Sequence, residues 1–224
     1  MQHFIVVEGL IGVGKSTLCR LLHTAWGMKL VLEPAETNPF LESFYEDPAR
    51  FGFPVQMFYL VNRWKQQQAI RQQDMFEAGV VSDYLFAKDR LFAEKTLPAV
   101  ELELYDRFAA ALGESAPRPD LVVYLHAPLD VVMGRIAKRR APGEERISKS
   151  YVSDLSKRYE RLLATWSLCP VLRIDNTQLD YANDADHQQQ VLDRIHAALT
   201  GEPAPRLEID VAEAQASLFG GGFY

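Results

Sequence analysis

The stretch VVEGLIGVGKSTLCRLL, residues 6–22, decides the fold of this chain. After a β-rich run and before a helical pattern, it matches G-x-x-x-x-G-K-[S/T] at Gly9, Gly14, Lys15 and Ser16. Glycines let a backbone curl so that its N–H groups converge on phosphate oxygens at the positive end of a helix. Lys15 would neutralise the outer phosphates, and the Ser16 hydroxyl would bind Mg²⁺. The stretch therefore predicts an ATP or GTP phosphate site at residues 9–17, formed by Gly9, Gly12, Gly14, Lys15, Ser16 and Thr17.

Short apolar strands alternate with helical patterns along most of the chain. Strands are expected at residues 3–8, 29–33, 79–83, 120–127 and 170–175, and helices at 14–26, 129–139, 149–166 and 186–199. A longer helical region from Asn38 to Gln73 is expected to break near Asp47 and Pro48, because the residue before a proline resists the helical conformation. This alternation predicts an α/β fold with a five-stranded parallel sheet and helices on both faces.

Composition and charge restrict the classes of function. With 224 residues, of which 48% are hydrophobic, the chain can form one domain, expected at residues 1–200. The net charge of −6 argues against a surface that binds nucleic acid or an anionic membrane directly. No apolar run approaches the ~20 residues of a membrane span, and the first residues lack a cleavable signal. Cys19 and Cys169 show no metal-type spacing, which fits a reducing cytoplasm.

Glu33 ends the second expected strand, in the sequence VLEP. Ligands of α/β folds bind beyond the C-terminal edge of the sheet, where this carboxylate is expected to project. A carboxylate there could accept a proton from a hydroxyl group that attacks the γ-phosphate of a nucleotide. Taken alone, the position also fits a helix-capping or surface glutamate.

The chain resembles the deoxyribonucleoside kinase family, cytosolic P-loop kinases that phosphorylate the 5′-hydroxyl of a deoxynucleoside, from about residue 4 to residue 199. The most specific part is FYEDPARFGFPVQMFYLVNR, residues 44–63, which is similar to the family segment F-Y-E-x-P-x-R-x-x-F-x-x-Q and the helix after it. The resemblance implies that Tyr45 binds the sugar 3′-hydroxyl. It implies that Gln56, helped by Arg63, reads the edge of the base. It also implies that Glu33 is the general base.

The residues of this segment support a base site independently. Gln56, Tyr59 and Arg63 are spaced i, i+3 and i+7, so they share one narrow face of a helix. A polar stripe on a surface helix usually faces water. Here the rest of the helix is apolar nearly all round, so the stripe is expected to face an enclosed pocket. The apolar residues are Phe51, Phe53, Val55, Phe58, Leu60 and Trp64.

Two carboxylates follow the third expected strand. Asp83 comes directly after the apolar run, as the metal-associated carboxylate of P-loop enzymes does. The resemblance implies that Asp89, six residues later, pairs with Arg63 against the base. In the family this pair accompanies cytosine or purine substrates rather than thymine.

The segment RIAKRRAPGEERIS, residues 135–148, is similar to the lid of the family, expected at about residues 138–148. Arg135 and Arg139 lie four apart on a helix and could clamp the phosphates of the donor. The resemblance implies that both arginines bind phosphate and that Glu144 helps to hold the sugar 3′-hydroxyl. A basic cluster of this kind can also be a solvated helix face.

The chain departs from the family at two places. Tyr84 and Leu85 stand where the family triplet Asp/Glu-Arg-Ser has arginine and serine, and Ala141 stands where the lid has a further arginine. The triplet arginine of the family stabilises charge around the phosphoryl group, and Arg90 or a lid arginine is a candidate to substitute for it. For the lid arginine missing at Ala141, the nearby candidates are Arg140 and Arg146.

Residues 201–224 change character, because Pro and Gly punctuate them and no helical period persists, so a mobile tail is expected. Gln215, Leu218 and Phe219 in this tail are similar to the Q-x-x-L-F peptides with which bacterial proteins dock on the replication sliding clamp. The alternatives are that the tail folds back on the body or a partner subunit, or that it reaches its own active site.

The sequence as a whole predicts an ATP- and Mg²⁺-dependent kinase that acts on a purine deoxynucleoside or on deoxycytidine in nucleotide salvage. The resemblance also implies a homodimer. Two rival functions share the phosphate loop: a nucleoside monophosphate kinase such as thymidylate kinase, and a nucleotide-binding regulator that has lost catalysis. The former would need cationic groups for a phosphate on the acceptor, and the latter would bind nucleotide without turnover.

Overall fold

The structure is a computed structural model that describes residues 3–32, 38–71, 79–113, 116–140, 144 and 147–202. Its sheet has five strands in the order β2-β3-β1-β4-β5, and every neighbouring pair is parallel. The predicted five-stranded parallel sheet is confirmed. The strands are β1 (His3–Gly9), β2 (Lys29–Val31), β3 (Gly79–Ser82), β4 (Leu121–His126) and β5 (Val171–Asp175).

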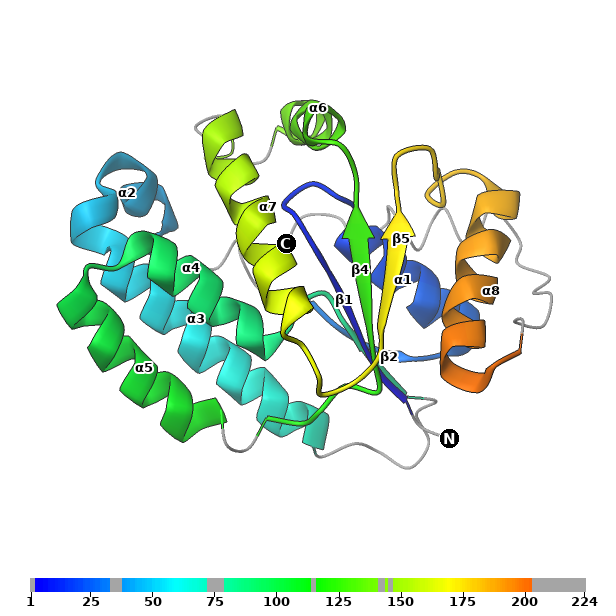
Figure 1. Cartoon of the computed structure of the whole chain (residues 1–224), viewed down its shortest axis with the longest axis horizontal. Coiled ribbons are helices and arrows are strands. Elements are labelled where there is room, and N and C mark those ends of the chain that lie inside the picture. Colours follow the sequence, from blue (N-terminus) through cyan, green and yellow to red (C-terminus); the bar gives the residue numbers. More distant parts are fainter. Residues whose placement is uncertain are drawn as a thin grey trace.

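Helices cover both faces of this sheet, as predicted. Helices α1 and α8 lie on one side, while α3, α4 and α7 lie on the other, with α5 outside α3 and α4 (Figure 1). The helices are α1 (Lys15–Trp26), α2 (Leu41–Glu46), α3 (Pro48–Arg71), α4 (Asp89–Thr96), α5 (Ala99–Gly113), α6 (Leu129–Arg139), α7 (Lys149–Ala164) and α8 (Ala185–Thr200), with a short 3₁₀ helix η2 (Phe86–Lys88).

The central strand β1 shows why two layers of helices form. Its side chains alternate between the two faces of the sheet. Ile5 and Val7 belong to the main apolar cluster, which includes buried residues of α1 and α8. Phe4 and Val6 belong to a second cluster with Ile70 of α3. Both faces of β1 are buried, so its carboxyl end can hold the phosphate loop rigidly between the layers.

The break predicted at Asp47 and Pro48 is present. Helix α2 ends at Glu46, Asp47 has φ −136° and ψ 81°, and α3 begins at Pro48. The sequence analysis did not assign α4 and α5 as helices. Helix α4 has only 8 residues and stops at Leu97, just before Pro98, so neither its length nor its period stands out in the sequence.

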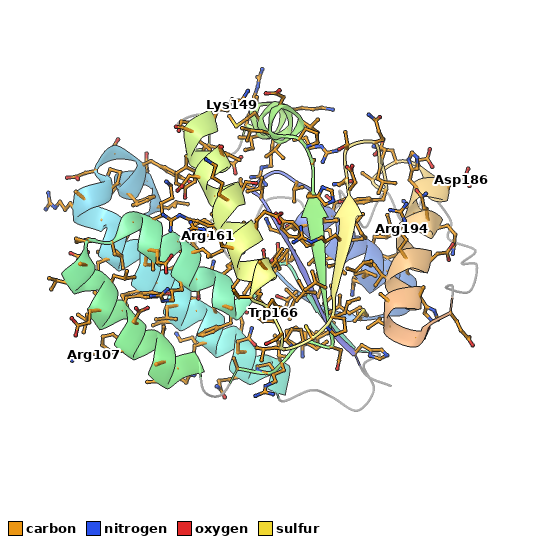
Figure 2. All side chains as sticks on the ribbon, viewed as in Figure 1. Arg107, Lys149, Arg161, Trp166, Asp186 and Arg194 are labelled. Carbon is orange, nitrogen blue, oxygen red and sulfur yellow. The ribbon has the colours of Figure 1, made fainter. Side chains whose placement is uncertain are left out.

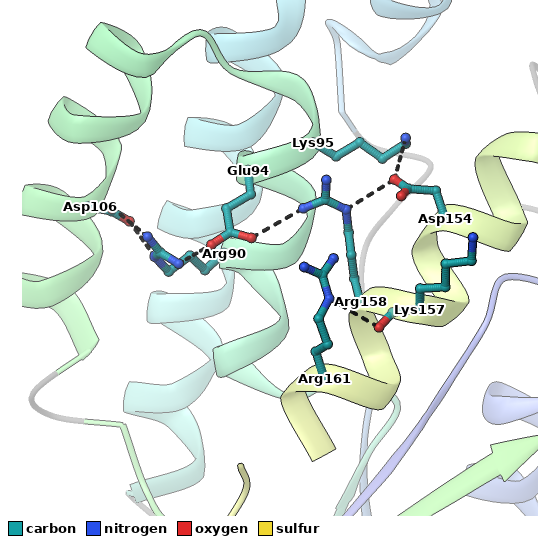
Figure 3. A network of polar contacts seen from close by, with 8 residues as sticks. All are labelled: Arg90, Glu94, Lys95, Asp106, Asp154, Lys157, Arg158 and Arg161. Carbon is teal, nitrogen blue, oxygen red and sulfur yellow. Dashed lines mark hydrogen bonds and ion pairs between the residues drawn. The ribbon is translucent and has the colours of Figure 1, made fainter. Parts of the chain in front are cut away.

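A polar network joins α4 to α7 across the surface (Figure 3). Lys95 Nζ donates to Asp154 Oδ2 at 2.7 Å, and Arg158 Nε donates to the same oxygen at 3.1 Å. Arg158 also reaches Glu94 at 3.2 Å. This network therefore anchors α7 to α4.

Several predictions fall on residues outside the described ranges and stay predictions. They concern Glu33, Ala141, Arg146 and the tail residues Gln215, Leu218 and Phe219. Across the described ranges, helices with both the length and the hydropathy needed to cross a bilayer are absent.

Candidate active site

The phosphate loop connects β1 to α1 and depends on its glycines. Gly14 caps α1 with φ 108°, and a Cβ atom there would lie 2.5 Å from the Tyr181 hydroxyl oxygen. At Gly9, with φ 147°, a Cβ atom would lie 2.4 Å from the carbonyl oxygen of Leu125. Both positions therefore exclude any side chain, and the backbone N–H groups at the start of α1 remain accessible to an anion.

Lys15 folds its side chain back over this loop. Its Nζ donates to the carbonyl oxygens of Gly9 at 2.9 Å and Leu10 at 3.1 Å. Burial lowers the pKa of Lys15 to about 8, and the positive charge of Lys88 is the second cause. A desolvated ammonium group with a neighbouring cation is poised to bind an anion, because an anion removes both penalties.

Ser16 and Asp83 lie together at the carboxyl edge of the sheet. The Ser16 hydroxyl donates to Asp83 Oδ2 at 2.6 Å. In the described part of the chain, groups of three or more His, Cys, Asp or Glu side chains that could hold a metal are absent. Magnesium usually takes only one or two protein oxygens, with water and substrate phosphates completing its octahedron. Two oxygen ligands beside a phosphate loop therefore fit Mg²⁺.

Arg63 of α3 and Asp89 of α4 form the ion pair that the resemblance implied. Both side chains are buried, and so is Gln56 on the same helix face, so the alternative of a water-facing stripe is excluded. The Arg63 guanidinium group lies 5.1 Å from the Tyr59 ring centre. Burial lowers the pKa of Arg63. The pair forms a rigid, polar wall of the kind that recognises a base edge.

Tyrosines gather at the other end of this helix face. Burial raises the pKa of Tyr59 to about 12, with Tyr45 of α2 as the second cause. Burial also raises the pKa of Tyr151, on α7, to about 12, again with Tyr45 next. Tyr45 therefore lies near both rings. The sequence analysis missed Tyr151, because nothing in its spacing connects it with α2 or α3.

The lid arginine Arg135 braces the phosphate loop. It donates to the carbonyl oxygens of Val13 at 3.3 Å and Asn176 at 2.8 Å. The Tyr181 hydroxyl donates to the carbonyl oxygen of Gly14 at 3.1 Å. Asn176 and Tyr181 were not singled out in the sequence. They follow β5, and only the strand order shows that this strand ends beside the loop.

Arg139 and Glu144 are paired with each other. Arg139 Nε donates to Glu144 Oε2 at 3.0 Å, and a second contact joins the same side chains. Arg139 is also one of the charges that act on Lys15, so this end of α6 is close to the phosphate loop. For Arg139 to bind phosphate and Glu144 to bind sugar, this pair has to open.

Arg90, one of the candidates to replace the triplet arginine, pairs with acidic residues of α4 and α5. Arg90 Nε donates to Asp106 Oδ1 of α5 at 3.0 Å, and Arg90 also contacts Glu94 (Figure 3). Its side chain is 56% exposed. These partners hold Arg90 on the surface between α4 and α5.

A second buried ion pair lies beside the loop and was missed in the sequence. Glu8 is 1% exposed and accepts hydrogen bonds from the Gly9 N–H at 3.1 Å, the Leu85 N–H at 2.5 Å and the Tyr159 hydroxyl at 2.9 Å. Lys88 Nζ lies 3.5 Å from Glu8 Oε1. The only sequence signal was a glutamate inside an apolar strand, directly before the first glycine of the loop.

The family model and the curated relatives give the same family. Residues 5–200 match the family model described as Deoxynucleoside kinase. The deoxyadenosine/deoxycytidine kinase of Bacillus subtilis is 33% identical over 205 residues, covering 87% of this chain and 92% of that protein. The deoxyguanosine kinase of the same organism is 33% identical over 192 residues, covering 83% of this chain and 93% of that protein.

The fold also matches a solved structure. The deoxyadenosine kinase from M. mycoides with bound dATP superposes with a TM-score of 0.74 at 22% identity, covering 87% of this chain and 100% of the other. At this identity the match concerns the fold alone. The family model spans the phosphate loop, the Arg63–Asp89 pair and the lid. This chain belongs to the deoxynucleoside kinase family.

Proposed function

We propose that this kinase transfers the γ-phosphoryl group of ATP to the 5′-hydroxyl of a deoxynucleoside, and that it prefers purine deoxynucleosides or deoxycytidine to thymidine. One observation carries the proposal: the segment after β3 contacts both the phosphate loop and the candidate base site. Asp83 binds Ser16 of the phosphate loop, and Asp89 pairs with Arg63 on the base side. The names of the relatives, which act on deoxyadenosine, deoxycytidine or deoxyguanosine, support the choice of base.

At the phosphate end, phosphoryl transfer requires charge neutralisation and alignment more than covalent chemistry. Lys15 and the N–H groups at the start of α1 neutralise the donor phosphates, and Arg135 keeps the loop in shape through Val13. Ser16 and Asp83 would hold Mg²⁺, which neutralises negative charge on the donor phosphates. Arg139 leaves Glu144 and binds the donor when the lid closes.

At the nucleoside end, Gln56 and the Arg63–Asp89 pair bind the base edge, because an amide and a fixed ion pair present donors and acceptors side by side. Tyr45 and Glu144 bind the sugar 3′-hydroxyl. This arrangement orients the 5′-hydroxyl toward the phosphate loop. Orientation of the two reactants accounts for a large part of the rate in such reactions.

The acceptor experiment tests the proposal and its rivals together. Phosphate transfer from labelled ATP is measured with deoxyadenosine, deoxyguanosine, deoxycytidine, thymidine and thymidine monophosphate. Transfer to a purine deoxynucleoside or to deoxycytidine is expected. Transfer to the monophosphate alone would instead identify a nucleoside monophosphate kinase. ATP binding without transfer to any acceptor would identify a regulator that has lost catalysis.

Replacement of Glu33 by glutamine is expected to lower kcat roughly 10²-fold, because a general base contributes at least this much to proton transfer. KM for the deoxynucleoside should change little, since the amide keeps the shape of the side chain. Glu160→Gln on the exposed face of α7 is the matched control and should retain wild-type kcat. A Glu33→Gln variant with wild-type kcat would exclude Glu33 as the base.

We also propose that α5 forms the interface of a homodimer. Val100, Leu104 and Phe108 are 83%, 45% and 46% exposed and lie one helical turn apart. The labelled Arg107 marks this helix at the outer edge of the molecule (Figure 2). An apolar stripe on an outermost helix fits the self-complementary surface of a twofold dimer.

Leu104→Glu is therefore expected to convert a dimer into a monomer of 25.4 kDa in sedimentation velocity. A buried carboxylate at the centre of an apolar interface is strongly unfavourable. Leu168→Glu is the matched control, because this exposed leucine lies outside α5. The proposal fails if the wild type is monomeric, or if both variants remain dimers.

A cytoplasmic location is part of the proposal. Among the described residues, Cys19 and Cys169 are free thiols. Burial raises the pKa of both thiols, which keeps them protonated and unreactive. Such buried thiols are common in proteins of reducing compartments.

A further inference from the structure

Two lysines contact the start of the phosphate loop. Lys88 ends η2 with 3% exposure, and its Nζ lies 3.5 Å from Glu8 Oε1. The other Glu8 oxygen accepts the Gly9 N–H, and the Gly9 carbonyl accepts from Lys15 Nζ. The positive charge of Lys88, after burial, is the second cause that lowers the pKa of Lys15. A phosphate bound at the loop would reduce this repulsion between the two ammonium groups.

We propose that Lys88 is a second phosphate-site cation: Glu8 holds its ammonium group beside the phosphate loop, where it stabilises the negative charge of the transferred phosphoryl group. This inference rests on the proposed kinase function. The turn after β3 then supplies three charges in order, since Asp83 contacts Ser16, Lys88 lies beside Glu8, and Asp89 pairs with Arg63.

Tyr84 supports this role for Lys88. The Tyr84 ring is fully buried near two cations, with Arg63 Cζ at 5.7 Å and Lys88 Nζ at 6.0 Å from its centre. Burial raises the pKa of Tyr84 to about 12, so the ring stays neutral. An arginine at position 84 would add a third cation close to these two. This chain has a neutral aromatic ring at position 84 and a lysine four residues later. Lys88 therefore supplies the positive charge that the family places at position 84.

The rival role for Lys88 is only to neutralise Glu8. The Glu8 carboxylate already accepts three hydrogen bonds, from the Gly9 N–H, the Leu85 N–H and the Tyr159 hydroxyl. Such hydrogen bonds stabilise a buried carboxylate without a cation. Glu8 therefore does not by itself account for the burial of a lysine.

Lys88→Met tests the proposal in steady-state kinetics. The expected result is a drop in kcat of roughly 10²-fold, the usual loss for one group that stabilises charge in the transition state. KM for the deoxynucleoside should stay within about threefold of wild type, because the base and sugar contacts are intact. Lys88→Arg should recover part of kcat, and Lys157→Met on the exposed face of α7 should behave as wild type. A Lys88→Met kcat within about threefold of wild type would overturn the proposal.

A double variant separates the two roles. Glu8→Gln combined with Lys88→Met removes both charges of the buried pair, so its thermal stability should exceed that of Lys88→Met alone. Under the proposal, kcat of the double variant stays as low as that of Lys88→Met. Recovery of kcat to near the wild-type value would show that Lys88 only neutralises Glu8, and would overturn the proposal.

Nucleotide binding gives a readout that does not depend on catalysis. If Lys88 acts on the phosphoryl group that is transferred, Lys88→Met should weaken the binding of ATP more than that of ADP, because only ATP carries this group. Lys157→Met should bind both nucleotides as the wild type does.

Calorimetry measures the affinities for ATP and ADP in the wild type and in Lys88→Met. A larger loss of affinity for ATP than for ADP is expected, and an equal loss for both nucleotides, or no loss, would overturn the proposal. If the wild type binds ATP but phosphorylates no deoxynucleoside, the kinase proposal fails. The binding experiment still decides in that case whether Lys88 acts on the phosphate site.

Discussion

Replacement of Lys15 by methionine is expected to lower kcat/KM for phosphate transfer roughly 10³-fold, because a preorganised cation at a phosphoryl group is worth several kcal/mol in the transition state. In the unliganded protein, Lys15 Nζ is held by the carbonyl oxygens of Gly9 and Leu10. It is therefore already aligned with the loop when the nucleotide arrives. Methionine keeps the length and apolar body of the side chain, so the loss reports the missing charge.

The same variant should be more stable than the wild type at neutral pH. The pKa of Lys15 is lowered from 10.5 to about 8, first by burial and then by the charge of Lys88. Below pH 8 both folded and unfolded chains carry the proton, and the folded chain bears the full penalty of burying the charge. Between pH 8 and 10.5 the folded state binds fewer protons, so the free energy of unfolding of the wild type rises with pH.

Chemical denaturation at pH 7, 9 and 10.5 measures this difference. The stability advantage of Lys15→Met should be largest at pH 7 and should shrink as the pH rises through that window. Lys157→Met is the control, since this lysine is exposed and should alter neither activity nor the pH profile. Wild-type transfer rates in Lys15→Met, or a stability difference that does not change with pH, would contradict this account.

Local signals in the sequence predicted the parts of the fold that depend on neighbouring residues. The phosphate loop, the strands and the break at Asp47 follow from glycine, apolar periodicity and proline, which act within a few residues. Helix α4 was not predicted, because its eight residues carry too short a period. Its place is fixed by packing, since Ala93 and Leu97 are buried against Leu60 of α3. Tertiary packing of this kind leaves little trace in a short window of sequence.

The candidate site also has parts that the sequence predicted and parts that it did not. A motif and a family resemblance gave the positions of Ser16, Asp83, Arg63 and Asp89. The structure shows a hydrogen bond between the first two and an ion pair between the last two. The pairing of Glu8 with Lys88 joins residues 80 positions apart on different elements. A pattern of neighbouring residues in the sequence cannot predict a partner this far away. The partners of Arg90 were hidden for the same reason, because its acidic neighbours on α4 and α5 are set by helix packing.

Asp89→Asn is expected to destabilise the protein by about 3 to 5 kcal/mol, because it leaves the Arg63 guanidinium group buried without its counter-charge. Both side chains of this pair are almost completely buried, with 5% and 4% exposure. The exposed pair of Arg173 and Glu160, with an Nη1–Oε2 distance of 2.9 Å, is the matched control. Glu160→Gln should cost about 1 kcal/mol or less.

The double variant Arg63→Met with Asp89→Leu separates stability from recognition. Replacement of a buried pair by apolar residues of similar volume is often neutral for stability, so the double variant should return to within about 1 kcal/mol of wild type. Its kcat/KM for the preferred deoxynucleoside should still be about 10- to 100-fold lower. This is the factor expected from the loss of one or two charge-assisted hydrogen bonds to the base.

Denaturant unfolding and kcat/KM for deoxyadenosine, deoxycytidine and thymidine measure both effects. If the pair reads the base, preference among the three substrates should narrow in the double variant, even though the fold is as stable as before. A double variant that keeps the wild-type order and size of preference would assign base selection to Gln56 or Tyr59 instead. Arg63 and Asp89 would then serve only to hold α4 against α3.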